Sequence, residues 1–401
     1  MKLPVTITAS LLAGALILTG CSVADASDGT DAAGTTTTVT DTTGTTEDTT
    51  ADSTSTESTS TESTSTGTTD TAADDVDWDA LSTTEVTLTD DGLTITEAGT
   101  YVLSGSTTGQ VVVNSDGPVR LILDGVTIAS TEGAAIQVDS AEVAVIELAD
   151  GTTNTVTDAA TRADEEIDGA IYSADDLVIT GTGSLTVNAA FADGIVGKDD
   201  LTISDGTVTV TSVDDGIRGK DSLTVTGGDI TVDAAGDGLK ASNSTDLGEG
   251  VLTISGGSVT VTSGDDAIKA EQQVIVSGGT ITVDASVEGI EAPVVAIEGG
   301  DISINASDDG VNAAASDIVT SGIGVTISGG TLAIVMGSGD TDAIDSNGDL
   351  TISGGTLDIT AQSAFDYDGS GTLSGGDITV NGEQVTELTG QMMGGGGGGP
   401  R

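Results

Sequence analysis

Short runs of alternating apolar and polar residues dominate the chain from about Val119 to residue 390. Leu201-Thr-Ile-Ser and Thr207-Val-Thr-Val-Thr are typical, with β-branched residues at many of the positions. Alternation with a period of two, without helical spacing, predicts strands that bury one face. Gly-Gly or Asp-Gly pairs separate many of these runs and predict tight turns. The pattern therefore predicts an all-β protein built from many short strands.

The strand pattern repeats with a basic unit of about 22 residues. Each unit has a strand, a glycine turn, a second strand, and then an acidic, a small and an apolar residue. The small residue marks the register at Ala135, Ala170, Gly194, Gly216, Gly238, Ala267, Gly289, Gly310, Ala343 and Ala364. Periods of about 20–50 residues are typical of solenoids and arrays. Three short strands per unit fit one coil of a parallel β-helix, whereas a β-propeller blade usually needs about 40 residues or more.

The N-terminal segment predicts export. Residues 1–21 combine Lys2, a short apolar run and Leu18-Thr-Gly-Cys21, which matches a lipoprotein signal peptide whose cysteine takes the lipid. An ordinary signal peptide is the alternative, but Cys21 is the only cysteine and lies at the required place. We therefore expect the protein on the extracellular face of a bacterial cell membrane, attached through the lipid alone.

The rest of the chain divides by composition. Residues 22–75 are rich in Thr, Ser and Asp and predict a disordered linker. Residues 76–118 are less repetitive and are expected to form an N-terminal β cap, because a solenoid end otherwise exposes its core. Residues 119–390 predict the parallel β-helix, and residues 391–401 predict a flexible Gly-rich tail.

Composition then narrows the chemistry. The 401 residues include 65 acidic and 9 basic residues, no histidine and one cysteine, and the net charge is −56. Such a polyanion repels nucleic acid. The absence of histidine excludes a Ser-His-Asp triad and histidine metal sites, and a single cysteine excludes an intrachain disulfide. We expect a monomer.

Much of the charge falls in a regular column. The residue before the small mark is acidic in seven units: Asp193, Asp215, Asp237, Asp266, Glu288, Asp309 and Asp342. Stacked about 4.8 Å apart, such carboxylates repel by roughly 1 kcal/mol per pair in water. Ca²⁺ would offset this repulsion; alternatively, each carboxylate accepts hydrogen bonds from backbone amides at a turn. We expect the turn role for most members and Ca²⁺ for a few. A separate stretch, residues 340–349, places oxygen ligands at short spacing around a glycine turn and adds Asp345 and Asn347. The metal candidates are therefore Asp215, Asp237, Asp266, Asp309, Asp342, Asp345 and Asn347.

Cations follow the small mark by two residues in three successive units, at Arg218, Lys240 and Lys269. Lys198 and Lys220, each in Gly-Lys-Asp, are expected beside them. In one interpretation this patch grips an anionic sugar; in the other it neutralises the acidic column through surface ion pairs of small individual value. The second fits any single residue better, but the whole patch is the best candidate surface for carbohydrate: Arg218, Lys220, Lys240, Lys269, Lys198 and Tyr172.

Several motifs resemble one known family. Ala170-Ile-Tyr-Ser-Ala-Asp-Asp-Leu-Val-Ile-Thr-Gly, Asp193-Gly-Ile-Val-Gly-Lys-Asp-Asp-Leu and Asp214-Asp-Gly-Ile-Arg-Gly-Lys-Asp are similar to the bacterial carbohydrate-binding β-helix proteins first described as clostridial cellulose- and pectin-binding proteins. The resemblance covers roughly residues 90–390. It implies a right-handed parallel β-helix like that of pectate lyases, binding of plant cell-wall polysaccharide, and bound Ca²⁺.

Three functions remain open at this point. The first is a non-catalytic, Ca²⁺-assisted binder of pectin, polygalacturonate or cellulose. The second is a Ca²⁺-dependent polysaccharide lyase acting on uronates, with Lys240, Lys269 or Arg218 as base; the third is a structural surface adhesin. Acidic surroundings should keep a lysine charged, which favours binding over catalysis. Aromatics are only 1% of the chain, which favours pectin over flat cellulose.

Overall fold

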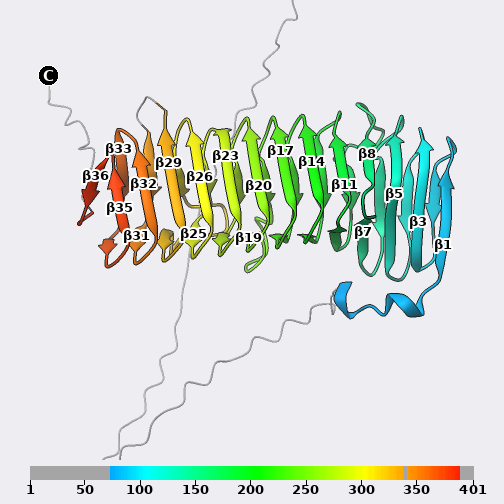
Figure 1. The fold of residues 1–401 in the computed structure, drawn as a ribbon, viewed down its shortest axis with the longest axis horizontal. Helices are drawn as coiled ribbons and strands as arrows, with labels where there is room; N and C mark the ends of the chain where they lie inside the picture. The colour runs from blue at the N-terminus through cyan, green and yellow to red at the C-terminus, as the bar shows by residue number, and fades with distance from the viewer. Residues whose placement is uncertain (1–72, 338–340, 389–401) are drawn as a thin grey trace, which may run out of the picture. The chain divides into compact units, whose positions relative to one another are not determined.

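The computed structural model describes residues 73–337 and 341–388. The predictions for the signal peptide, for Cys21, for all but the end of the linker and for the Gly-rich tail lie outside these residues. Two 3₁₀ helices, η1 (Ala73–Asp75) and η2 (Trp78–Ala80), precede a long series of strands (Figure 1). Within the described ranges, no helix has the length and apolar character needed to cross a membrane.

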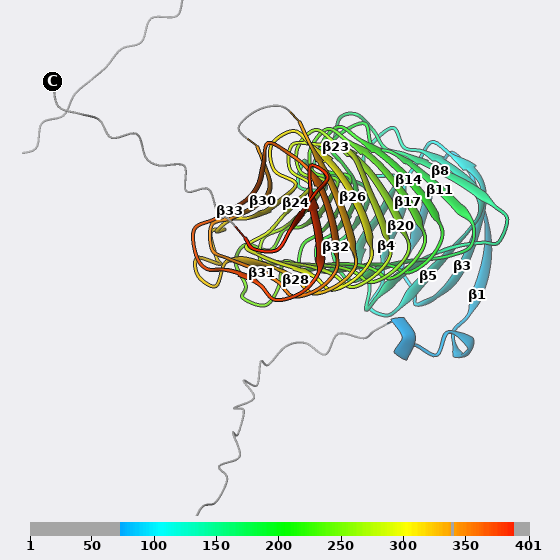
Figure 2. The same ribbon diagram turned by 60° about the vertical axis from the view of Figure 1, so that its left-hand side comes forward.

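The strands of each coil lie on three faces of the described region. Figure 2 looks obliquely along the coils and separates β31, β32 and β33, which belong to different faces. The first, face 1, comprises β7 (Ala144–Leu148), β10 (Leu177–Gly181), β13 (Asp200–Ile203), β16 (Ser222–Val225), β19 (Val251–Ile254), β22 (Gln273–Val276), β25 (Val294–Ile297), β28 (Gly324–Ile327), β31 (Asp349–Ile352) and β34 (Gly371–Leu373).

Face 2 follows face 1 after the glycine turn of each coil. It comprises β8 (Thr153–Thr157), β11 (Ser184–Asn188), β14 (Thr207–Ser212), β17 (Asp229–Ala234), β20 (Ser258–Ser263), β23 (Thr280–Ser286), β26 (Asp301–Ala306), β29 (Thr331–Met336), β32 (Thr356–Thr360) and β35 (Asp377–Val380). The N-terminal strands β1 (Thr83–Leu88), β3 (Gly99–Thr107) and β5 (Val119–Ala129) join faces 1 and 2 into one 24-stranded sheet. Its last strand, β36 (Glu383–Val385), pairs antiparallel with β35.

Face 3 is a separate 12-stranded sheet. Its strands are β2 (Leu93–Ile95), β4 (Val111–Asn114), β6 (Ile136–Ser140), β9 (Gly169–Ser173), β12 (Asp193–Gly197), β15 (Ile217–Gly219), β18 (Leu239–Ala241), β21 (Ile268–Ala270), β24 (Ile290–Glu291), β27 (Val311–Ala313), β30 (Asp342–Ser346) and β33 (Ser363–Tyr367). Each strand pairs in parallel with its equivalent in the next coil, as β15 does with β18. The protein is therefore an all-β solenoid, as the repeat predicted.

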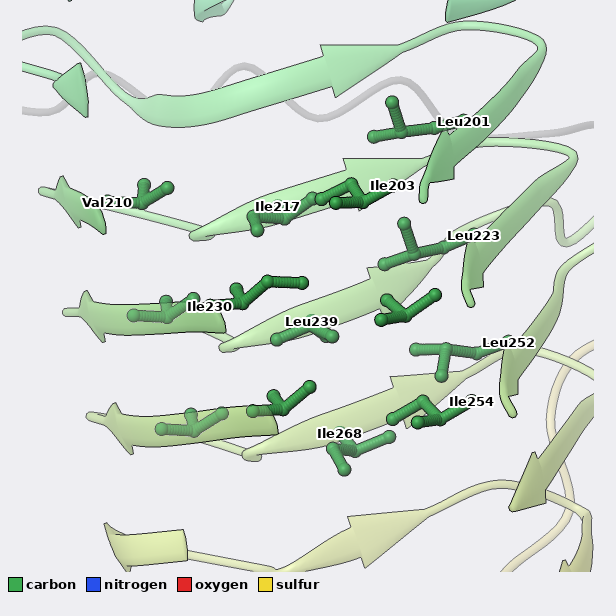
Figure 3. Close-up of a cluster of buried hydrophobic side chains, with 14 of the residues drawn as sticks. Leu201, Ile203, Val210, Ile217, Leu223, Ile230, Leu239, Leu252, Ile254 and Ile268 are labelled. Atoms are coloured by element: carbon green, nitrogen blue, oxygen red, sulfur yellow. The ribbon is translucent and has the colours of Figure 1, made fainter. Parts of the chain in front are cut away.

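The apolar residues at each register mark stack inside the coils. Ile217 pairs with Leu239, and Leu239 pairs with Ile268. Figure 3 shows these side chains meeting Leu223 from face 1 and Ile230 from face 2. All of them are almost completely buried, so small aliphatic side chains make a continuous core without aromatic residues at its centre.

The small residue at the register mark is required by packing between coils. A Cβ on Gly216 would lie 2.3 Å from Cγ1 of Val232 and 2.5 Å from the carbonyl oxygen of Gly238. The glycine turns have a second constraint: Gly257 has φ +80°, and a Cβ there would lie 2.8 Å from the carbonyl oxygen of Gly227. Glycine recurs because it alone combines positive φ with such close stacking.

The segment expected as an N-terminal cap contributes coils of its own. Strand β1 pairs with β3, and β2 pairs with β4, all in parallel. Residues 73–82, which precede β1, lie outside the sheets. There, Trp78 donates from Nε1 to the carbonyl oxygen of Ala73 (3.1 Å) and packs against Arg120, whose Cζ lies 5.1 Å from the ring centroid. Trp78 therefore has a packing role in this segment.

Replacing one core residue tests how much the apolar stack contributes. We expect Ile217→Ala to lower the free energy of unfolding by about 2–5 kcal/mol, because it leaves a cavity between coils that cannot close fully. Val213→Ala is the matched control, because Val213 lies at a corner and is 55% exposed. Denaturant titration of both variants measures the difference; equal losses would contradict a shared core.

Candidate functional site

The outward side of face 3 carries one column of mainly charged residues. Parallel pairing stacks Arg218 on Lys240, Lys240 on Lys269 and Lys269 on Glu291. The same register continues to Asn312, Asp345 and Asp366. The alignment of cations on successive coils, predicted from the spacing, is confirmed.

The acidic column lies beside the cations and is tied to the backbone. Oδ1 of Asp193 accepts from the backbone N–H of Asp215 (3.1 Å), and Oδ1 of Asp215 accepts from that of Asp237 (3.0 Å). Asp237 and Asp266 repeat the arrangement at 3.0 Å. Farther along, Oδ1 of Asp309 accepts from the backbone N–H of Asp342, also at 3.0 Å. These residues thus make the backbone-amide contacts expected for most of the column.

From Asp193 to Asp266, the second oxygen of each carboxylate in the column contacts a cation. Nε of Arg218 lies 2.8 Å from Oδ2 of Asp193. Nζ of Lys240 lies 2.7 Å from Oδ2 of Asp237 and 3.0 Å from Oδ2 of Asp215. Because charged side chains alternate in sign along this stretch, the protein itself offsets the repulsion between the stacked acids. Arg218 and Lys240 therefore neutralise the acidic column, which was the second of the two interpretations of these cations.

Lys269 completes this charge ladder. Its ammonium group contacts Asp266 (2.6 Å) and also Glu291. Burial alone would lower the pKa of Lys269, but these two carboxylates more than offset it and the pKa is raised. The pKa of Lys240 is raised in the same way, by Asp237 and Asp215 against the effect of burial. Both lysines therefore stay protonated, and neither has the depressed pKa that a general base needs.

The three other residues predicted for sugar binding, Lys198, Tyr172 and Lys220, have contacts of their own. Lys198 lies 3.6 Å from Oδ2 of Asp168 and 5.8 Å from the ring centroid of Tyr172, near the beginning of the ladder. Lys220 contacts Oδ1 of Asp221 (2.9 Å) instead. Lys220 is thus ion-paired, as the cations of the ladder are, and its part in carbohydrate binding stays a prediction.

Beyond Lys269 the column continues without cations. The sequence has no Lys or Arg between Lys269 and Arg401. We call this part the acidic end; it comprises Glu288, Asp309, Asn312, Asp342, Asp345 and Asp366. Burial and then Glu291 raise the pKa of Glu288 to about 8, and burial above all raises the pKa values of Asp309 and Asp345 to about 6. The acidic end therefore retains carboxylates whose charge no basic side chain compensates.

Asn312 supplies an additional oxygen at the acidic end. Its Nδ2 donates to both carboxylate oxygens of Glu288, at 3.1 and 3.0 Å. The residue is only 8% exposed, and its Oδ1 is buried without a hydrogen-bond partner among the described residues. Carboxylate and amide oxygens form the donor set that Ca²⁺ prefers. Glu288 and Asn312 were not among the predicted metal ligands, although the absence of basic residues after Lys269 could have indicated them.

Two groups of three acids bring one oxygen from each within 4.8 Å among the described residues. One is Asp237 with Asp265 and Asp266, and the other is Asp266 with Glu288 and Glu291. Lysines already contact Asp237, Asp266 and Glu291. The remaining predicted metal ligands lie in neither group: Asp215, Asp309, Asp342, Asp345 and Asn347. Asn347 is exposed at a turn, with Nδ2 3.5 Å from Oδ2 of Asp345.

A groove opens where the ladder changes into the acidic end. Its walls include Lys269 and Glu291 on face 3, Pro293 just before β25, and the segment Ala314–Asp317 that follows β27. The groove thus lies beside the last cation of the ladder and the first carboxylates beyond it.

Comparison with known proteins extends this description. A family model described as carbohydrate-binding domain-containing protein matches residues 89–340 and 275–391. A carbohydrate-binding domain-containing protein of Acetivibrio thermocellus is 44% identical over 124 residues, which are 29% of this chain, and the chain spans 43% of that relative's length. A solved structure of a polysaccharide lyase-like protein from C. thermocellum, a gadolinium derivative, has 35% identity and a TM-score of 0.48, covering 57% of this chain and 87% of that chain.

Raised carboxyl pKa values predict a pH-dependent stability. Because the folded protein holds the protons of Glu288, Asp309 and Asp345 more tightly than the unfolded chain, their contribution is full below about pH 4 and is lost as pH rises through about 6 to 8. We expect the Tm in chelator to fall across this window, and to fall less in Glu288→Gln. The exposed Glu298→Gln is the control; identical pH profiles for both variants would contradict the assignment.

Proposed function

Because the chain belongs to the family of carbohydrate-binding domain-containing proteins, we propose that it is a non-catalytic binder of plant cell-wall polysaccharide. The observation that carries this proposal is the family match, which extends over nearly all of the solenoid. The ion pairs of face 3 support it, because Lys240 and Lys269 are held by carboxylates. A lyase would need one of these side chains as a base, and their raised pKa values favour binding instead.

For ligands on face 3 we favour an acidic polysaccharide such as pectin or polygalacturonate, held through Ca²⁺. The cations of the ladder are already paired, so they offer little to an anionic sugar. Carboxylates of the acidic end and Oδ1 of Asn312 would hold Ca²⁺ ions on successive coils, and the positive charge of these ions would bridge the protein to uronate carboxylates. The matching donor chemistry and the unpartnered, buried Oδ1 of Asn312 support this assignment.

The remaining parts of the proposal concern placement. A lipid on Cys21 would attach a monomeric protein to the extracellular face of the cell membrane, and the linker would carry the solenoid toward the polysaccharide. We also propose that the coils wind in the right-handed sense and that the N-terminal segment caps the stack. A solenoid end needs such cover because it otherwise exposes its core.

Polysaccharide pull-down tests the calcium-assisted binding. We expect the full chain to bind polygalacturonate in Ca²⁺ and to lose most of this binding in chelator, while Asn312→Leu weakens it in Ca²⁺. Asn243→Leu is a matched control, because Asn243 is a buried asparagine outside the acidic end. Binding that is unchanged by chelator would contradict the Ca²⁺ bridge, and failure to bind any polysaccharide would favour a structural adhesin.

A product assay separates binding from cleavage. Incubation with polygalacturonate and Ca²⁺ should release no unsaturated uronate, because Lys240 and Lys269 remain protonated. Product that appears with the wild-type chain and disappears with Lys240→Ala would establish a lyase and overturn the non-catalytic proposal.

A further inference from the structure

Face 2 presents a regular array of hydroxyl groups to solvent. Every second residue of a strand points outward, and equivalent residues of adjacent strands lie about 4.8 Å apart. The middle outward column runs through Thr127, Thr155, Thr186, Thr209, Thr231, Thr260, Thr282 and Ser303 without interruption. Within the described ranges, none of these hydroxyls hydrogen-bonds to another residue. The fold therefore leaves a row of free donors and acceptors on successive coils.

The N-terminal half of this array is uncharged. On β8, β11 and β14, which lie side by side in Figure 1, all three outward columns are neutral. We call these residues the neutral platform: Thr153, Thr155, Thr157, Ser184, Thr186, Asn188, Thr207, Thr209 and Thr211. Carboxylates enter the flanking columns only at the next strand, as Asp229 and Asp233. A neutral area of this size contrasts with the net charge of −56.

A groove runs along the edge of face 2 beside the platform. It is lined by two carboxylates, by hydroxyl side chains and by glycines of the turns: Asp205, Asp229, Thr182, Thr207, Ser258, Gly206, Gly228 and Gly257. These glycines have positive φ and carry no side chain to fill the space. The platform is thus bordered by a polar hollow that extends across several coils.

The other two faces do not offer an equivalent surface. Face 3 carries the charge ladder. On face 1, Ala73 and Asp74 of the N-terminal segment lie beside Val178 and Thr202 and line a pocket with them. Outward residues of β16, β19, β22, β25 and β28 on face 1 are also uncharged, but Ile275 and Ala296 interrupt their hydroxyl column. Among the described strands, face 2 is therefore the face on which an uncharged ligand meets an unbroken row of hydroxyls on adjacent neutral strands.

We propose that the neutral platform binds an uncharged, extended β-linked polysaccharide that lies across the strands. A threonine hydroxyl both donates and accepts, so it can pair with sugar hydroxyls, while its methyl group contacts the apolar edge of the ring. The strands hold the hydroxyls in place before binding, which reduces the entropy lost on association. A uronate chain would be repelled here, because no strand of face 2 contains Lys or Arg and Asp229, Asp233 and Asp301 border the array.

This inference rests on the proposed function and adds a second surface to it. The calcium-assisted site belongs to the acidic end of face 3, whereas the neutral platform needs no ion. The two surfaces therefore differ in their ligands and in their response to chelator.

The test removes three hydroxyls from adjacent strands while keeping side-chain volume and β propensity. The variant carries Thr155→Val, Thr186→Val and Thr209→Val. The matched control carries Thr326→Val, Thr351→Val and Thr372→Val, which are outward residues on three successive strands of face 1. Both full-length variants are assayed against insoluble cellulose, soluble mixed-linkage β-glucan and polygalacturonate with Ca²⁺, after circular dichroism and Tm have verified folding.

We expect the face 2 variant to bind the neutral glucans at least about tenfold more weakly, because each lost hydroxyl removes a hydrogen bond. The control should bind as the wild type does, both variants should retain polygalacturonate binding, and chelator should leave glucan binding unchanged. If the triple variant is unstable, Thr186→Glu replaces it in the assay. This single change adds a charge at the centre of the platform and should weaken binding to the neutral glucans by a similar factor.

The outcomes separate the two ideas. Wild-type binding to polygalacturonate but not to neutral glucans overturns the platform and leaves the proposed function standing. Equal glucan binding by the face 2 variant, or equal loss in the face 1 control, also overturns it. If the wild type binds no polysaccharide at all, the proposed function itself fails.

Discussion

Parallel stacking of equivalent residues about 4.8 Å apart is the constraint on which the rest of this structure depends. Every position of the repeat becomes a column of side chains, one from each coil. Neighbouring side chains in a column must pack without steric clash and without uncompensated charge repulsion. Inside, the column through Ile217, Leu239 and Ile268 meets this condition with aliphatic contacts. At the turns, glycine meets it by leaving out the side chain, since a Cβ on Gly257 would touch the carbonyl oxygen of the previous coil.

A column of carboxylates is the least favourable kind of column, because like charges repel. The two halves of this column differ in how that repulsion is reduced. From Asp193 to Asp237, one oxygen of each acid accepts from a backbone amide and the other contacts Arg218 or Lys240. The carboxylate of Asp266 contacts Lys269. Beyond Lys269 no basic residue follows on the column, and burial raises the pKa of Glu288 instead. The carboxylates of the first half therefore have basic partners, whereas those of the acidic end have no basic partner among the described residues. The same regularity on face 2, with threonine in place of aspartate, produces a neutral surface.

Several of these features could be read directly from the residue pattern. Alternation and the period of about 22 residues predicted the strands and the solenoid, because both depend on local side-chain direction and on repetition. The stacking of Arg218 on Lys240 and Lys269 was also predictable. Each of these residues follows the register mark of its coil by two positions, and residues at equivalent positions pair when the coils stack in register. Family membership agrees with the resemblance in the motifs.

The ion-pair partners of the charged groups could not be predicted from the residue pattern. The spacing alone left open whether Lys240 grips a sugar or neutralises acids; the contacts with Asp215 and Asp237 show the second. It likewise did not identify Asp221 as the partner of the ammonium group of Lys220. The sequence by itself determined the columns and their order, because these follow from periodicity. Only the tertiary structure decided which side chains are buried, paired or left with an unpartnered oxygen, as in Asn312, because these depend on distances between coils and between faces.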